Sequence, residues 1–340
     1  MKYLILLTLN LFLVSGCATI TGPQVSREEI LRAQEELMVK SLGFRLKQLE
    51  RVNNIGYRLI VNIPQKEIEV TEEPQPYLGI YVAKIDKYLK KLFQLYKDRG
   101  LVVIALIDDS PAKKAGVIPG DVLVSIDNNR ISSVRDFNRH SSKLKIGDSI
   151  RLSIERGGLL KDILLTVGSI PINVPIIAVD AQEVNAAASR DAIYVTYGLI
   201  NFAKSDDEIA AVLGHELAHF VRGHVSKAQI GSLLSLLIGI PLGLIAEEAA
   251  PGTGDLVMRT TGLFNATYSR DLEREADYFG VKFVYFSGYD PCVCMSFHER
   301  FAIEIPQSMI KNYLSTHPSS PERMLRVKKA IEELATINCP

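Results

Sequence analysis

Apolar residues recur at helical spacing over residues 26–61, in the first part of the chain that has a regular pattern. Ser26 and Glu29 form the Ser-x-x-Glu pattern of an N-terminal capping box, which predicts that one long helix begins here. Residues 64–76 combine prolines with charged side chains, and this composition favours a linker after the helix. The apolar positions of the helix are Ile30, Leu31, Leu37, Leu42, Leu46, Leu49 and Ile55.

Residues 77–168 change to short apolar runs that are separated by turn residues, which is typical of β-strands. Two longer segments between these runs have helical patterns, and a short one begins with a proline. The pattern therefore predicts a β-rich domain in the middle of the chain. Its expected strands are 78–82, 101–107, 150–155 and 162–167, with another strand after the turn at residues 119–121. Its expected helices are 85–97 and 133–144, and a helical turn is expected at 111–115.

The part of the chain after residue 169 is predicted to be mostly helical. Strands are expected at 174–179 and 193–197, and acidic residues 206–208 then suit the positive end of a helix. Apolar residues follow at helical spacing through Phe220. Taken together, the three patterns predict an α+β protein.

The composition fits a chain with one large or two medium-sized cores. Of the 340 residues, 47% are hydrophobic, and 39 basic residues balance 39 acidic ones. Nucleic-acid binding usually needs a basic face, and the formal net charge here is zero, so no nucleic-acid partner is expected.

The first residues have the pattern of an export signal. Lys2 precedes an apolar run that is too short to span a bilayer comfortably. The ending Leu-Val-Ser-Gly-Cys resembles a bacterial lipoprotein signal, which implies that residues 1–16 are removed and that Cys17 carries the lipid. Because Ala18 follows it, the resemblance implies the periplasmic face of the outer membrane. An ordinary signal peptide with an incidental cysteine is the alternative.

A second apolar segment covers residues 228–246 and contains no charged side chain. Its length would allow a transmembrane helix, but one proline and several glycines interrupt it. It also separates two groups of residues that must share one site. We therefore expect a hairpin that covers the cleft or dips into the lipid surface, rather than a span.

The segment GHELAHFVRGH, residues 214–224, contains the pattern His-Glu-x-x-His. His215 and His219 are four residues apart, so on a helix both rings leave the same face and can bind one zinc ion. Glu216 lies beside them and could take a proton from the attacking water. On a continuous helix His224 would point away from the pair, so we expect a surface residue or one that contacts a ligand, not a third ligand.

A catalytic zinc site needs a third protein ligand, and the best candidate lies in the segment SRDLEREAD, residues 269–277. Glu273 and Asp277 share one helix face, so Glu273 could bind zinc while Asp277 accepts the outer N–H of a ligand histidine. Glu275 faces elsewhere and is expected to be a solvated acid.

These two motifs together resemble the HtpX and CAAX-prenyl endopeptidase family of zinc gluzincins, in its exported BepA-like branch. The resemblance implies that His215, His219 and Glu273 bind one zinc ion, with Glu216 as general base and Asp277 as support. It further implies that an edge strand that begins at Asn185 and Ala186 pairs with the substrate backbone.

The exported branch has a further motif, which matches Ser315-Thr316-His317-Pro318 and Arg323. The resemblance implies that His317 lies near the metal, where it contacts zinc in a closed state or stabilises the transition state. Arg323 would lie beside the site as an anion partner. The alternative for His317 is that this segment only ends an element, because proline disfavours helix at the preceding residue.

The middle domain resembles a PDZ domain of the HtrA type. The resemblance is carried by Ser110-Pro111-Ala112, Ala115-Gly116 and Pro119-Gly120-Asp121. It implies that an extended peptide is added to a sheet edge, and that the loop Tyr77-Leu78-Gly79-Ile80 holds the terminal carboxylate. A PDZ domain that only packs against its neighbour is the alternative.

Three cysteines follow Cys17, and an exported chain meets an oxidising compartment. One disulfide is expected, from Cys339 to either Cys292 or Cys294.

The predicted organisation is a signal peptide at 1–16, an N-terminal peptidase helix at 17–65, an inserted PDZ domain at 76–169 and a peptidase domain at 170–340. The predicted activity is zinc-dependent cleavage of misfolded or unassembled cell-envelope proteins, in which water activated by zinc attacks the peptide bond. The protein would be exported and held at the membrane through Cys17, and also through residues 228–246 if these enter the lipid surface. One alternative is a PDZ-based chaperone with a mainly structural zinc, and another is a membrane-embedded processing peptidase.

Overall fold

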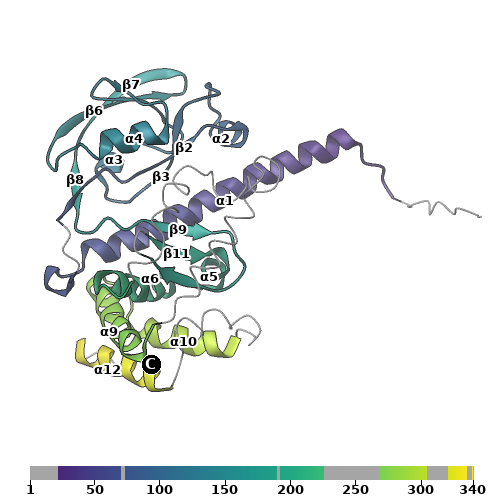
Figure 1. Cartoon of the computed structure of the whole chain (residues 1–340). Coiled ribbons are helices and arrows are strands. Elements are labelled where there is room, and N and C mark those ends of the chain that lie inside the picture. The colour runs from purple at the N-terminus through teal and green to yellow at the C-terminus, as the bar shows by residue number, and fades with distance from the viewer. Residues whose placement is uncertain are drawn as a thin grey trace, which may run out of the picture.

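The computed structural model describes residues 22–69, 73–189, 192–225, 268–304, 321–334 and 339. Figure 1 shows a β-rich domain above, a mainly helical domain below, and the long helix α1 running between them. The mixed α+β class that the sequence predicts is confirmed. The predicted lipid site at Cys17, the apolar segment 228–246 and the motif around His317 lie outside the described residues.

Helix α1, Arg27–Val61, contributes to both domains. It begins with the predicted capping box, in which the Ser26 side chain accepts from the Glu29 amide and the Glu29 carboxylate accepts from the Ser26 amide. The N-terminal end of the helix extends beyond both domains (Figure 1). Leu42, Leu46 and Leu49 pack against the β-rich domain, whereas Val52, Ile55, Leu59 and Ile60 lie in the core of the helical domain.

The segment after α1 is more regular than the predicted linker. It contains the 3-10 helix η1, Gln65–Glu67, and strand β1, Gln75–Tyr77. Strand β1 pairs antiparallel with β8, Gly168–Ile170. The chain therefore enters and leaves the β-rich domain at the same place.

The β-rich domain is built on an antiparallel sheet in the order β2-β3-β4-β6-β7, with β5 paired to β4. Side chains of β3 alternate between two clusters: Leu101 and Val103 face one side of the sheet, and Val102 and Ile104 face α1 on the other. Both faces of β3 are therefore buried. This burial explains why its residues form a continuous apolar run in the sequence. The strands are β2 Ile80–Lys84, β3 Leu101–Leu106, β4 Val122–Ile126, β5 Asn129–Arg130, β6 Ser149–Arg156 and β7 Leu159–Thr166.

The helices of this domain are shorter than their patterns predict. Helix α2, Lys87–Phe93, is capped by Asp86 and ends at Gln94, whose φ of 53° is left-handed. The remaining helices are α3, Pro111–Lys114, and α4, Val134–Ser141, which begin after the caps Ser110 and Ser133.

The helical domain also contains a three-stranded sheet in the order β10-β11-β9. Strand β10, Ala186–Ala188, pairs antiparallel with β11, Ile193–Thr196, which pairs parallel with β9, Ile176–Val179. Among the described residues β10 is therefore one of the two outer strands of this sheet, and β9 is the other. Helix α5, Tyr197–Phe202, follows directly and is capped by Thr196.

Helix α6, Asp206–Val221, is the centre of the helical domain, because thirteen of its sixteen residues are buried. It packs against α1, β10, α9 and α10, and α12 packs against α9 and α10. A helix that is apolar on most sides fits this position. The bounds of the other helices are α9 Arg270–Phe286, α10 Cys292–Glu304 and α12 Pro321–Leu334.

A disulfide joins Cys292 to Cys339, and Cys294 is a buried free thiol. The structure thus chooses one of the two pairings that the sequence left open. The bond ties the C-terminal residues to the first turn of α10.

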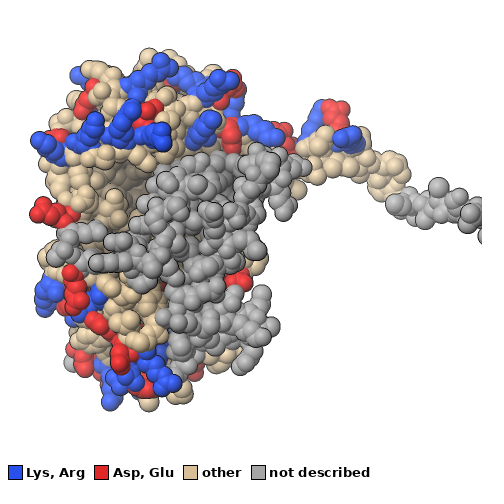
Figure 2. Space-filling view, viewed as in Figure 1, with Lys and Arg blue, Asp and Glu red and all other residues tan. Residues whose placement is uncertain are grey.

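The surface carries both signs of charge. Figure 2 shows Lys and Arg side chains interspersed with Asp and Glu side chains on both domains, in agreement with the balanced composition. Within the described part of the chain, no helix is long and apolar enough to cross a membrane.

We expect Leu59→Ala to lower the free energy of unfolding by about 2–5 kcal/mol, because it leaves a cavity in a packed core. Leu59 is 0% exposed, and Leu37 on the same helix is 64% exposed. Leu37→Ala is therefore the control, with an expected change of about 0.5 kcal/mol or less. Denaturant unfolding of both variants measures the difference, and equal effects would contradict the placement of α1.

Candidate metal centre

Three buried side chains converge at the contact of α6 with α9. The Nε2 atoms of His215 and His219 are 3.1 Å apart. One oxygen of Glu273 lies 3.5 Å from His215 Nε2, and the other lies 3.4 Å from His219 Nε2. The three side chains can therefore offer one ligand atom each to a single ion.

These separations fit zinc. Ligand atoms bound tetrahedrally at about 2.1 Å are about 3.4 Å from each other, close to the distances found here. Two imidazoles and one carboxylate are also a donor set of catalytic zinc sites, which leave a fourth position for water or substrate. The residues present thus fit a zinc ion.

Two glycines allow α9 to approach α6 closely enough for Glu273 to reach the histidines. A Cβ atom at Gly280 would lie 3.0 Å from the backbone N and Cα of His215, and one at Gly214 would lie 3.0 Å from the Gly280 carbonyl oxygen. Because backbone faces backbone at this crossing, neither position has room for a side chain without a shift of one helix.

Asp277 and Arg323 surround the ligands with charge. Asp277 Oδ1 lies 3.0 Å from Nδ1 of His215, as expected for a support that fixes the tautomer of a ligand. Arg323, from α12, donates to both oxygens of Asp277 at 2.6 and 2.7 Å, and its third nitrogen lies 3.0 Å from Glu273. The anions that Arg323 contacts are therefore the protein's own carboxylates.

The pKa values follow from these pairs. Burial acts to lower the pKa of His215, but its contacts with Asp277 and Glu273 outweigh this and raise the pKa to about 10. Burial acts to raise the pKa of Asp277, but Arg323 and His215 hold that pKa well below its usual range. Asp277 is therefore a carboxylate at neutral pH, which is the form that accepts a hydrogen bond from His215.

Glu216 lies next to β10, an outer strand of the small sheet. It is 0% exposed, and its Oε2 accepts from the Ala188 amide at 2.7 Å. Asn185 and Ala186, the predicted start of the edge strand, are also buried, and Ala186 is the first residue of β10. The backbone of Asn185 bonds to Thr196 on β11, which fixes the start of the strand.

His224 lies elsewhere than a continuous helix predicts, and Glu275 has partners that the sequence did not predict. Helix α6 ends at Val221, and Gly223 adopts a φ of 70°. The His224 amide then donates to the His219 carbonyl, and the Gly223 amide donates to the Phe220 carbonyl, which is a Schellman turn. This reversal returns His224 to the His219 ring. Glu275 is not simply solvated, because it pairs with Arg222 and His224.

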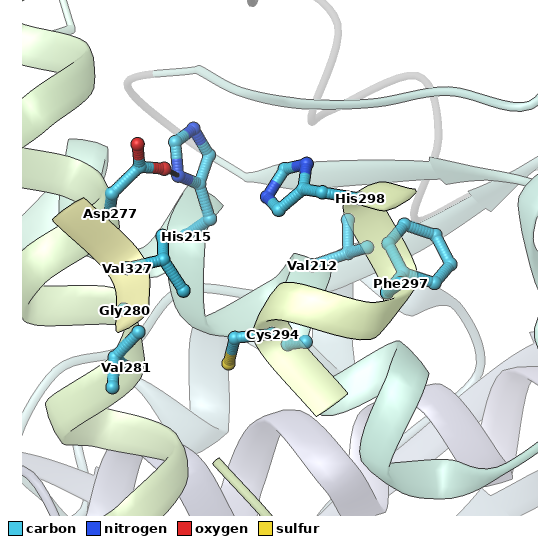
Figure 3. A pocket seen from close by; sticks show the side chains of 10 residues that line it. Val212, His215, Asp277, Gly280, Val281, Cys294, Phe297, His298 and Val327 are labelled. Carbon is cyan, nitrogen blue, oxygen red and sulfur yellow. Dashed lines mark ion pairs between the residues drawn. The ribbon is translucent and has the colours of Figure 1, made fainter. Parts of the chain in front are cut away.

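The sequence patterns did not indicate two other residues of the site. The Tyr268 ring stacks on His219, with centroids 3.8 Å apart, and its hydroxyl lies 3.5 Å from the Ala188 carbonyl. His298 points from α10 toward His215 (Figure 3). Neither belongs to a spacing motif, so no local signal identifies them.

A small cavity lies behind His215. Its volume of about 20 Å³ is enough for one water molecule, and Asp277, Cys294 and His298 contribute to its wall. Figure 3 shows these side chains with His215 and Asp277 paired at one side. Burial lowers the pKa of His298 to about 4, so this ring is neutral at physiological pH.

The fold and the site define a two-domain protein in which a helical domain with a His-His-Glu centre follows a β-rich domain. Residues 168–331 match the sequence model of peptidase family M48, and residues 76–167 match that of the PDZ domain. The C-terminal domain is therefore similar to the M48 peptidases, and the domain before it is similar to PDZ domains.

Curated relatives agree with this division. Mitochondrial metalloendopeptidase OMA1 of Arabidopsis thaliana is 36% identical over 148 residues, which are 43% of this chain and 29% of the relative. A probable periplasmic DegP-like serine endoprotease of Pseudomonas fluorescens is 36% identical over 95 residues, covering 28% of this chain and 20% of the relative. Each match thus spans less than a third of the relative's length.

Among solved structures, the HtrA-type protease AlgW with a decapeptide matches with 27% identity. The match covers 29% of this chain and 31% of that chain, with a TM-score of 0.28.

We expect Gly280→Ala to weaken zinc binding at least tenfold, because the new methyl group pushes α9 away from His215 and moves Glu273 from the other ligands. Gly43→Ala in α1 is the control, since its Cβ would meet only the end of the Leu92 side chain, at 3.2 Å. Competition with a chromophoric chelator measures both affinities. A Gly280→Ala variant with unchanged affinity would show that the close crossing is not required.

Proposed function

We propose that the chain is a zinc-dependent endopeptidase that cleaves extended segments of misfolded or unassembled cell-envelope proteins. The observation that carries the proposal is the convergence of His215, His219 and Glu273, with the Glu216 carboxylate buried beside them and held by strand β10. The match of residues 168–331 to peptidase family M48 supports the same reaction class.

Zinc bound by these three residues would polarise the scissile carbonyl and the attacking water. Glu216 takes the proton from this water and delivers it to the leaving amine nitrogen, as a general base and then a general acid. The hydrogen bond from Ala188 orients the carboxylate for this task. Asp277 keeps His215 in the orientation that directs Nε2 toward the metal.

The substrate backbone would pair with β10. An extended peptide can add to an outer strand by main-chain hydrogen bonds, and β10 occupies that place in the described sheet. The Asn185 side chain is 0% exposed, and among the described residues its amide oxygen and nitrogen have no hydrogen-bond partner. Buried amides are normally paired, so the start of β10 carries an unused hydrogen-bond donor and acceptor.

The PDZ domain would present substrates to this site. Strand β2 is an outer strand of its sheet, and the predicted carboxylate loop of Tyr77, Leu78, Gly79 and Ile80 leads into it. The Leu78 and Gly79 carbonyls accept from Ala112 and Ile107, which fixes the loop to the body of the domain. Helix α1 packs against this domain and also into the peptidase core. It would therefore connect a chain terminus bound at the loop to the peptidase domain.

We expect Glu216→Gln to reduce cleavage of an unfolded protein by at least about 10²–10⁴-fold while zinc stays bound, because the amide cannot take a proton. Gel-based proteolysis and the zinc content of the purified protein are the two measurements. Glu299→Gln, at an exposed position on α10, is the control and should keep full activity. A fully active Glu216→Gln variant would refute the mechanism, and rescue of an envelope defect by the inactive variant would favour a chaperone role.

The proposed location is the periplasmic face of the outer membrane, through a lipid on Cys17, as in the exported branch of the family. The Cys292–Cys339 disulfide supports an oxidising compartment. We expect Cys17→Ser to move the full chain from the membrane fraction to the soluble fraction. Cys294→Ser is the control, because Cys294 is a buried free thiol. If the Cys17→Ser protein stays in the membrane fraction, the lipid anchor is not what holds it there.

A further inference from the structure

His224 contacts the metal ligand His219 on the side of the ring that faces away from the metal centre. The Nδ1 atoms of the two rings are 3.0 Å apart. The Nε2 atom of His219, on the opposite side of its ring, lies 3.1 Å from His215 Nε2. His224 therefore reaches the one nitrogen of His219 that a metal does not use.

Only one arrangement of protons agrees with metal binding. A metal takes the lone pair of His219 Nε2, so Nδ1 of that ring carries a hydrogen and must donate it. Nδ1 of His224 then accepts, and this places the hydrogen of His224 on Nε2. That nitrogen lies 3.3 Å from Oε2 of Glu275, which accepts. The chain of donors and acceptors ends at a carboxylate.

Glu275 is itself fixed on its other oxygen. Arg222 donates to Glu275 Oε1 at 2.7 Å, and the Arg222 guanidinium lies over the Phe279 ring at 4.2 Å. Arg222 also pairs with Glu69, in the segment that leads from α1 to the PDZ domain. The Glu275 carboxylate is therefore held in its orientation toward His224.

We propose that His224 and Glu275 are positioning residues that hold His219 in its metal-binding tautomer and orientation. They do for His219 what Asp277 does for His215. One ligand is supported by a carboxylate directly, and the other by a carboxylate through a second imidazole. The inference rests on the metal site of the proposed function, and it concerns the affinity of that site for zinc.

The test is the zinc dissociation constant of the full chain, measured by competition with a chromophoric chelator. His224→Phe keeps a ring beside His219 but removes the acceptor, and we expect it to weaken zinc binding 10–100-fold. His224→Asn keeps an acceptor close to the position of Nδ1, and its affinity should stay within about threefold of the unchanged chain. Glu299→Gln is again the control and should not change the affinity.

Glu275→Ala provides a second route to the same question. It should weaken zinc binding by about tenfold, and the double variant with His224→Phe should bind zinc no more weakly than His224→Phe alone, because the two residues act in one chain. The melting temperatures of the metal-free proteins show whether each variant is folded. If His224→Phe does not fold, Glu275→Ala and His224→Asn decide the question.

Unchanged zinc affinity in folded His224→Phe, or in Glu275→Ala, would overturn the proposal. An equal loss in His224→Asn and His224→Phe would also overturn it, because the acceptor would then not matter. Failure of the proposed function gives a different result, since the unchanged chain would then not bind zinc, or its Glu216→Gln variant would still cleave.

Discussion

The close crossing of α6 and α9 is the constraint on which the site depends. Gly214 and Gly280 let the two backbones touch, and a Cβ atom at Gly280 would lie 3.0 Å from the His215 backbone. At this separation Glu273 reaches both histidines, and Asp277, one turn further along α9, reaches the outer nitrogen of His215. A wider crossing would remove the third ligand and the support of the first ligand together.

Burial of charge at this crossing requires partners from several elements. Glu273 and Asp277 are almost fully buried, and isolated carboxylates there would be strongly destabilised. Arg323 of α12 offsets part of this cost by pairing with both. On the other side, Arg222 and His224 pair with Glu275. The metal centre is thus the middle of a larger network, in which each histidine ligand has its own carboxylate behind it.

Helix α1 connects the two domains mechanically. Its middle part covers the PDZ sheet, and its C-terminal part lies in the core of the peptidase domain. Asn53, buried between them, bonds to Ile176 of β9 and accepts from the Tyr81 hydroxyl of β2. Because β1 and β8 also close the stem of the PDZ domain, the two domains are joined at two places rather than by a loose linker.

The sequence by itself determined the features that depend on local spacing. The capping box at Ser26, the paired histidines with Glu216 between them, and the apolar strand at residues 101–106 all follow from the local pattern within one element. Spacing also indicated the segment that supplies the third metal ligand, residues 269–277. Glu273 and Asp277 are one helical turn apart there, so one can bind the metal while the other supports a histidine ligand.

Only the tertiary structure decided which residues meet across elements. Cys292 and Cys294 lie in one helix, and the path of the C-terminal residues selects Cys292 for the disulfide. Tyr268 and His298 come to the site from elements that carry no motif. His224 is the clearest case: a continuous helix directs it away from His219, but α6 ends at Val221 and the left-handed Gly223 turns the chain back. Periodicity predicts the direction of a side chain only while its helix or strand continues. Where the element ends, backbone geometry and packing decide which residues the side chain contacts.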